Sequence, residues 1–247
     1  MSDQYESLQQ VTEKPRLMSL DALEFNDVFK TVLRRVYLMM TLGLLTTAGT
    51  AYIGSLPYFS NLIFSTPFLF LGLVIAELIL VIVLTAALRH LSAVSAGLLF
   101  FFYAAINGIT LSAIFLTYTP GNIFVAFLIT ASLFGAMTII GYSTRKNLDS
   151  WRGYLLVGLI SMIILSVVNL FVGSSQVEWI TSIVLIFIFL GLTIYDTQRI
   201  KKMISSTMQF GHTGLLTKLG IIGALSLYLD FVNLFLRILR IFGRRRS

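Results

Sequence analysis

The chain of 247 residues is 57% hydrophobic and only 12% charged, whereas an ordinary soluble domain has about 25% charged residues. A soluble core of this size would not bury so much apolar surface, so the composition excludes a soluble globular domain and predicts a polytopic membrane protein. The net charge of +7 does not indicate nucleic-acid binding, because the basic residues stand between apolar segments, where lipid headgroups and topology explain them. The absence of cysteine excludes disulfides and thiolate chemistry.

The chain divides into a short polar segment and a long apolar one. Residues 1–29 are polar and acidic, and we expect them to form a mobile head ahead of a transmembrane domain at 30–247. Apolar segments of about 20 residues, the length that crosses a bilayer as a helix, follow one another through that domain. They predict an all-α fold of seven transmembrane helices at 33–54, 67–88, 92–117, 120–142, 153–172, 178–198 and 219–241.

Basic residues flank alternate ends of these segments. By the positive-inside rule, the N-terminus and the basic connections are cytoplasmic. The basic residues concerned are Lys14, Arg16, Lys30, Arg34, Arg35, Arg89, Arg145, Lys146, Arg152, Arg199, Lys201, Lys202 and Lys218. A full seventh crossing places Arg237 and Arg240 on the other side, whereas a re-entrant segment would keep them inside; the length of the last segment favours the crossing. We interpret glycines within the spans, among them Gly72, Gly108 and Gly135, as close-packing points between helices.

One carboxylate lies in the middle of the last span, GALSLYLDFVNLFLRILR at 223–240. A charge near the bilayer centre costs roughly 2.5–3.5 kcal/mol on insertion scales, so Asp230 should face protein or water and should have a partner. Asn233 and Arg237 share its helix face, which indicates that this face looks inward. The candidate partner is Asp196, in GLTIYDTQRIKK at the end of the preceding apolar segment.

The ionisable residues of the spans each have an alternative explanation. Asp196 has Arg199 three residues later and fits an interfacial salt bridge equally well. Glu77 is either a protonated acid bonded to a neighbouring helix or a carboxylate of a pore or cavity. If Asp196 and Asp230 meet, they cannot both ionise cheaply and should share one proton. Such a pair would be a proton-operated latch between the last two helices, Arg89 could capture one carboxylate, and the oxygens suit Ca²⁺.

Signatures of enzymes are missing from the sequence. It has no HExxH, no GxSxG and no paired Cys/His cluster, and both histidines fall outside the predicted spans. We therefore expect no catalytic residues and no cofactor. Ca²⁺, if bound, is expected as a transported ion.

The two aspartate motifs, GLTIYDTQRIKK at 191–202 and ALSLYLDFVNLFLRILRIFG at 224–243, resemble those of bacterial members of the Bax inhibitor-1 family, also called transmembrane Bax-inhibitor-motif proteins. The runs NGITLSAIF and FGAMTIIGYSTRKNL and the helix containing Glu77 also fit, and the resemblance covers about residue 30 to the C-terminus. It implies seven helices, the last enclosed by the other six, in the bacterial cytoplasmic (inner) membrane. The run NGITLSAIF lacks the Gly-Pro of many relatives.

The resemblance implies a proton-sensitive Ca²⁺ leak. In the family, the aspartates at the positions of Asp196 and Asp230 form the pH-sensing pair, an arginine at the place of Arg89 competes for it, and an acidic residue matching Glu77 is associated with the pore. Asn233 follows on the same face of the last helix as Asp230.

Three functions stay open at the level of sequence. The first is a pH-gated calcium leak channel. The second, attributed to some bacterial relatives, is an interaction protein that modulates a membrane quality-control protease or a similar partner, with residues 1–29 as the contact. The third is a proton-coupled transporter of an unidentified solute. Membrane lipids are the expected surroundings in each case, and a monomer is favoured.

Overall fold

The structure is a computed structural model that describes residues 2–87, 90–144, 146–209 and 215–243, with side chains described from Asp27 onward except at Pro67 and Gln209. Every element in this part of the chain is a helix. In chain order these are α1 (Ser2–Gly54), α2 (Pro57–Phe64), α3 (Pro67–Ala87), α4 (Ala93–Leu111), α5 (Ala113–Thr117), α6 (Pro120–Ser143), α7 (Trp151–Val172), α8 (Ser175–Gln209) and α9 (Leu216–Phe242).

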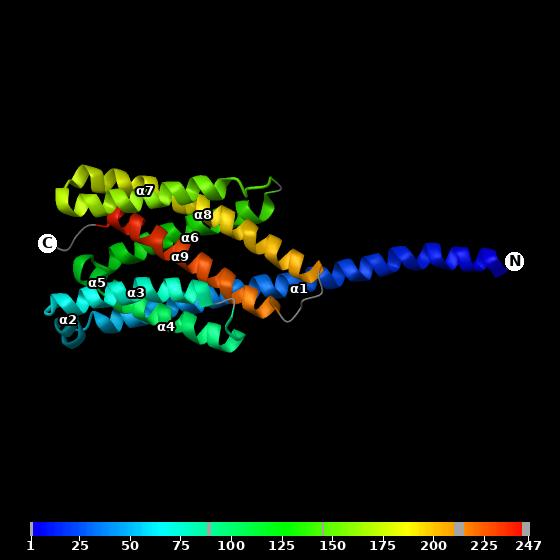
Figure 1. Cartoon of the computed structure of the whole chain (residues 1–247), viewed down its shortest axis with the longest axis horizontal. Helices are drawn as coiled ribbons and strands as arrows, with labels where there is room; N and C mark the ends of the chain where they lie inside the picture. Colours follow the sequence, from blue (N-terminus) through cyan, green and yellow to red (C-terminus); the bar gives the residue numbers. More distant parts are fainter. Residues whose placement is uncertain (1, 88–89, 145, 210–214, 244–247) are drawn as a thin grey trace.

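Seven spans in the described residues are long and apolar enough to cross a membrane. They are the second half of α1, then α3, α4 together with α5, and α6 to α9. This confirms the predicted all-α fold with seven membrane-crossing helices. Figure 1 shows these helices side by side, with α7 at one edge of the bundle and α9 passing through its middle.

Local sequence signals explain where several helices begin and end. The Ser92 hydroxyl caps α4 by accepting a hydrogen bond from the Ser95 N–H at 3.1 Å. Pro120 occupies the first turn of α6, where its missing N–H costs little, behind the capping residue Thr119. α7 ends at Gly173, whose φ of 69° is left-handed and favours glycine.

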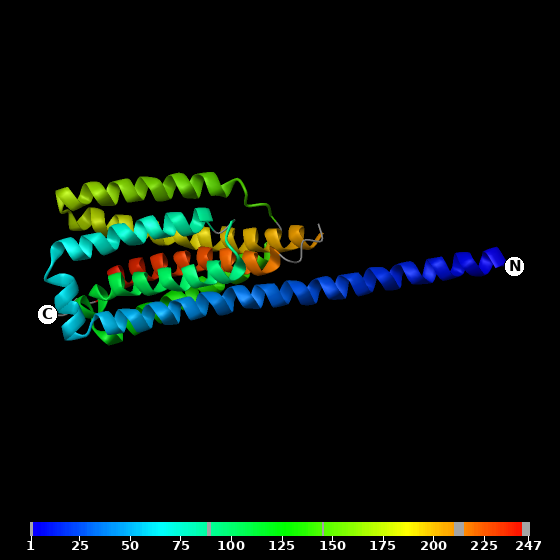
Figure 2. The ribbon, with the colours of Figure 1, turned by 60° about the horizontal axis from the view of Figure 1, so that its bottom comes forward.

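Two features of the elements differ from the sequence-based expectation. The connection at 55–66 contains the short helix α2, which Pro57 begins. In addition, α1 continues as one helix through the expected boundary at residue 29, because residues 16–53 hold neither proline nor an uninterrupted polar run, and Gly43 and Gly49 alone do not break it. The first half of α1 projects beyond the bundle, as Figure 2 shows (blue). Mobility of this segment stays a prediction.

The last helix runs the full length of the bundle. It begins beside α1, where the Arg35 Nη1 donates to the Thr217 hydroxyl at 3.0 Å. It ends at the other extreme, where Arg240 forms an ion pair at 3.3 Å with Glu178, near the start of α8. α9 therefore extends from one end of the described bundle to the other, as a full crossing requires.

α9 is the most buried span. Of its most apolar stretch 61% is buried, whereas the other spans reach at most 33%. It packs against α1, α4, α6 and α8, and these contacts form the main core around Tyr228, Ala224 and Leu227. Enclosure by all six other spans stays a prediction, since α3 and α7 lie mainly against α4 and α8.

Glycines set the closest helix approaches at some predicted positions and not at others. A Cβ at Gly108 of α4 would collide with the Thr50 hydroxyl and with the backbone of Thr47, so α1 and α4 touch through backbone. The interpretation of Gly72 and Gly135 as packing points is wrong, because a Cβ at either position would meet nothing within 4 Å. Gly72 is exposed, and Gly135 lies at a hollow between α1 and α6, so neither brings two helices into contact.

The contrast between Gly108 and Gly72 yields a prediction. Gly108→Ala should destabilise the fold by about 1–3 kcal/mol, because backbone atoms of α1 cannot yield to the added methyl. Gly72→Ala is the matched control and should be neutral or stabilising by up to about 1 kcal/mol, since alanine is the better helix former. Thermal unfolding of the purified variants in detergent measures both; equal effects would contradict the close contact between α1 and α4.

Candidate functional site

Asp230 lies in the middle of α9 and is only 5% exposed. Its Oδ2 is buried and has no hydrogen-bond partner among the described residues. A buried charge without a partner is costly, so this carboxylate requires a proton, a cation or a water on that oxygen. The position thus has the character expected of a functional group at membrane depth.

Asp196, on α8, is the acidic neighbour of Asp230, and the two carboxyl groups interact electrostatically. Asp196 is also in contact with the hydroxyl of Ser226, one turn before Asp230 on α9. Arg199 and Arg152 act on Asp196 through the field of their charges, yet neither forms an ion pair with it in the described structure. The structure therefore brings the two predicted aspartates together, and proton sharing between them stays a prediction.

Three hydroxyl groups come together where α1, α6 and α8 meet. The Tyr37 hydroxyl faces those of Thr138 and Thr197, and Thr197 directly follows Asp196. The Thr138 and Thr197 hydroxyls are buried and complete no hydrogen bond among the described groups. These groups form a small polar cluster between the three helices that can donate or accept hydrogen bonds.

Gln198, in the same YDTQ motif, fixes the connection between α6 and α7. Its side chain accepts from the Leu148 N–H at 3.0 Å and donates to the Lys146 carbonyl at 2.7 Å. The end of the α8 motif thereby holds the 144–150 connection in place. Sequence reasoning assigned this glutamine no role.

Glu77 and Asn107 pair across α3 and α4. The Asn107 amide donates to the Glu77 carboxylate, so α3, otherwise an apolar helix, is attached to the bundle through its acidic residue. This geometry fits the expectation of a carboxyl group hydrogen-bonded to a neighbouring helix. It uses Glu77 as an acceptor, for which an ionised carboxylate suffices.

The pair extends into a polar chain that ends on α1. The Tyr228 hydroxyl donates to the Asn107 Oδ1 at 3.0 Å and lies 2.7 Å from the Thr47 hydroxyl. The Thr47 hydroxyl also lies 3.1 Å from the Gly43 carbonyl and 2.9 Å from the Ala104 carbonyl, so its one proton has several acceptors. The chain links α1, α9, α4 and α3 through Thr47, Tyr228, Asn107 and Glu77. Tyr228 is fully buried, with ring contacts to Phe100 at 5.5 Å.

α9 therefore carries two polar contacts on different faces. Tyr228 connects it to α1 and α4, and Asp230, two residues later, faces α8. Sequence reasoning missed Thr47, Asn107 and Tyr228. The signal that would have found them is the one used for the acids, since a polar side chain in a membrane span requires a partner on another helix.

The other predicted residues do not join these contacts. Arg89 lies outside the described residues. Asn233 is half-buried and its amide donates to the Leu229 carbonyl of its own helix at 2.8 Å. Neither residue is placed next to the aspartates by the structure.

The aspartates offer few ligands for a resident metal ion. In the part of the chain that is described, no group of three or more His, Cys, Asp or Glu side chains gathers in one place. Ca²⁺ takes six to eight oxygen ligands, and two carboxylates with one hydroxyl supply only part of that shell.

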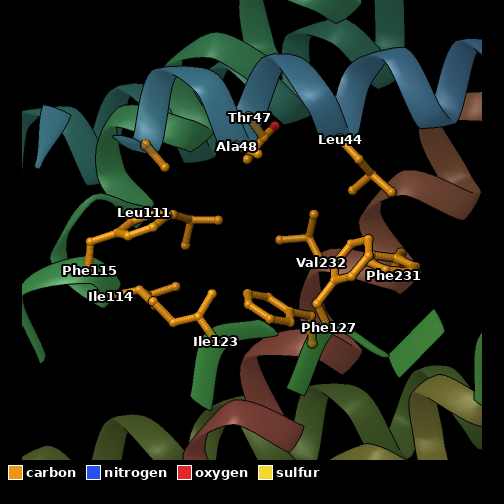
Figure 3. Close-up of a pocket in the computed structure, with 12 residues that line it drawn as sticks. Leu44, Thr47, Ala48, Leu111, Ile114, Phe115, Ile123, Phe127, Phe231 and Val232 are labelled. Carbon is orange, nitrogen blue, oxygen red and sulfur yellow. The ribbon is translucent and has the colours of Figure 1, made fainter. Parts of the chain in front are cut away.

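An apolar cavity of about 120 Å³ lies on the other side of α9, between α1 and α6. In Figure 3, Thr47 points into it from α1 and Val232 from α9, and nearly all other lining atoms are carbon. Such a lining gives an ion no ligands. This cavity therefore offers no path for an ion between α1 and α6.

The helical bundle and its buried acidic groups define a multi-pass α-helical membrane protein. The chain belongs to the Bax inhibitor-1 family, because the family described as "Inhibitor of apoptosis-promoting Bax1" matches residues 29–247. This confirms the resemblance inferred from the two aspartate motifs.

Relatives of similar length support the assignment. Inner membrane protein YbhL of Escherichia coli (strain K12) is 43% identical over 88% of this chain and 93% of its own. A protein of Borreliella burgdorferi is 40% identical over 87% of this chain and 92% of its own. A membrane protein of Streptococcus pyogenes serotype M3 is 38% identical over 85% of this chain and 91% of its own.

The polar chain yields a prediction about stability. Tyr228→Phe should lower the free energy of unfolding by about 0.5–2 kcal/mol, because it leaves Thr47 and Asn107 without their common partner. Tyr154→Phe makes the same chemical change on α7, where the tyrosine is 81% exposed, and should have almost no effect. Reversible unfolding in mixed micelles compares them, and equal losses would contradict the polar chain.

Proposed function

We propose that the protein is a pH-sensitive calcium leak channel of the Bax inhibitor-1 type, gated by a proton shared between Asp196 and Asp230. The observation that carries this proposal is the buried Asp230, with one oxygen unpartnered and Asp196 as its acidic neighbour. Two adjacent carboxyl groups in a poorly solvated place hold one proton between them, and losing it places two negative charges side by side. The pair then repels, which separates α8 from α9.

The remaining residues have subsidiary roles in this proposal. α9 is the central helix, enclosed by the other spans, so a change at Asp230 reaches the whole bundle. Arg89 competes for a carboxylate, while Glu77 and Asn233 lie on the ion pathway. Ca²⁺ is the transported ion, attracted by the acidic groups, and the chain catalyses no chemical reaction.

The proposed location is the bacterial inner membrane, with the N-terminus in the cytoplasm. The E. coli relative is named as an inner membrane protein. The basic residues support the orientation, since Lys146, Lys201 and Lys202 gather at one end of the bundle, around the connection between α6 and α7. Arg237 and Arg240 then lie on the outer side.

The gating proposal predicts a flat pH profile for variants of the pair. Wild-type protein in liposomes should pass Ca²⁺ at a rate that varies between about pH 6 and 8, by at most about tenfold per pH unit for one titrating proton. Asp230→Asn, alone or with Asp196→Asn, removes that proton equilibrium and should abolish the variation. Absence of flux above protein-free liposomes at any pH would eliminate a channel as the intrinsic activity.

Asp149→Asn is the matched control for these substitutions. Asp149 is exposed in the connection after α6 and forms an ion pair with Lys202 at 2.9 Å. The hydrogen bond from Lys202 lowers the pKa of the Asp149 carboxyl. Asp149 therefore stays ionised throughout the assay, and it is neutralised only at a pH below the usual pKa range of an aspartate. The control should keep the wild-type profile. A profile flattened equally by Asp149→Asn would remove the special role of the buried pair.

A second candidate function is modulation of a membrane partner such as a quality-control protease. The observation that favours it is the first half of α1, which projects beyond the bundle as an uncovered helix with an acidic sequence (Figure 2).

This candidate makes the opposite prediction to the channel. Removal of residues 1–26 should abolish copurification of the partner while leaving reconstituted Ca²⁺ flux unchanged. Asp230→Asn should leave copurification intact, and a loss of copurification in that variant alone would exclude the first half of α1 as the contact.

A further inference from the structure

A crevice of about 490 Å³ separates α7 from α9 at the end of the bundle opposite the N-terminus. α7 packs chiefly on α8, and none of its most apolar stretch is buried, so its inner face does not close onto α9. The walls are Ile163, Ser166, Asn169 and Leu170 from α7, Glu178 and Thr181 from α8, and Arg237 and Arg240 from α9.

Arg237 is a half-buried cation whose Nε lacks an acceptor in this crevice. Its Nε is buried and has no hydrogen-bond partner among the described residues, and no carboxylate lies within ion-pair distance of its guanidinium there. Glu178, the acidic group of the crevice, is already paired with Arg240 at 3.3 Å. Two arginines and one glutamate leave one positive charge of the crevice uncompensated, and this charge attracts an anion.

We propose that this crevice binds an oxyanion of the phosphate class on Arg237 and Arg240. A guanidinium presents N–H groups in a planar fork that matches two oxygens of one phosphate, which would satisfy the orphaned donors. Asn169 lines the same space; it gives one amide hydrogen to the Ser174 carbonyl and can donate the other to a third oxygen. The hydroxyls of Ser166 and Thr181 donate to the Met162 and Val177 carbonyls of their own helices.

The phosphate has two chemical sources, an anionic lipid headgroup or free phosphate. The apolar wall favours the lipid, because Ile163 and Leu170 are 50% and 81% exposed and offer an acyl chain a surface below the arginines. The place of Arg237 and Arg240 in the last turns of α9 is also the depth at which basic side chains meet headgroups.

The two tryptophans of the chain make the test site-specific. Trp179 directly follows Glu178, whereas Trp151 begins α7 at the opposite end of the bundle. Trp151→Phe therefore leaves one fluorophore beside the crevice. Protein with this change is reconstituted in vesicles of phosphatidylcholine and phosphatidylglycerol, with bromine on the acyl chains of one lipid or the other. Quenching of Trp179 then reports which lipid occupies the neighbourhood.

We expect brominated phosphatidylglycerol to quench Trp179 with about fivefold preference over brominated phosphatidylcholine. This is the preference for an anionic lipid that about one basic residue near the membrane surface produces. Arg237→Gln should abolish the preference while leaving quenching by phosphatidylcholine intact, which also shows that the variant is folded. Lys30→Gln, the same charge change on exposed α1, should keep it. Glu178→Gln frees Arg240 and should increase it, so the site remains testable even if Arg237→Gln fails to fold.

Inorganic phosphate in pure phosphatidylcholine vesicles distinguishes the sources. A saturable change of Trp179 emission with phosphate, absent with chloride at equal ionic strength and absent in Arg237→Gln, identifies the free anion as a ligand. Lipid preference without a phosphate response identifies the headgroup. Equal quenching by both lipids with no phosphate response would overturn the site, as would a preference that Arg237→Gln leaves unchanged.

Discussion

The cost of holding the carboxylate of Asp230 inside an apolar bundle is the constraint on which the rest of the structure depends. A lone charge at this depth is unfavourable, so the neighbouring helices must place polar groups next to it. On α8 that group is Asp196. That requirement draws α8 against α9, and Tyr228 holds the opposite face of α9 to α1 and α4. α9, which carries both Tyr228 and Asp230, is thus also the most buried span.

The described structure separates a central group of helices from two peripheral ones. α3 joins the bundle through Glu77 and Asn107, and α7 lies on α8 and leaves a crevice beside α9. Both are almost uniformly apolar and expose most of their surface, as lipid-facing helices do. Polar contacts between helices therefore concentrate where α1, α4, α8 and α9 meet.

Much of this was predictable from the sequence, because apolar length and charge alternation report directly on the membrane. The spans follow from the length of the apolar segments. The importance of Asp196 and Asp230 follows from the high cost of placing a charged group inside a membrane span. That Asn107 and Thr47 need partners on other helices follows from their place in membrane spans, but the identity of those partners depends on helix rotation, which the sequence does not report. For the same reason Gly108 could not be distinguished from Gly72, since hydropathy does not say which face of a helix meets another backbone.

The continuity of α1 has a mechanical consequence. From residue 16 to its end at Gly54 the helix contains no proline, and at 1.5 Å per residue this part forms a rod of about 60 Å. Its outer part stands clear of the bundle. Its inner part carries Arg35, which donates to Thr217 of α9, and further on Thr47, which lies 2.7 Å from the Tyr228 hydroxyl. A tilt of the free end therefore acts first on the contact between Arg35 and Thr217, and the rigid helix connects that contact to the one beside Tyr228.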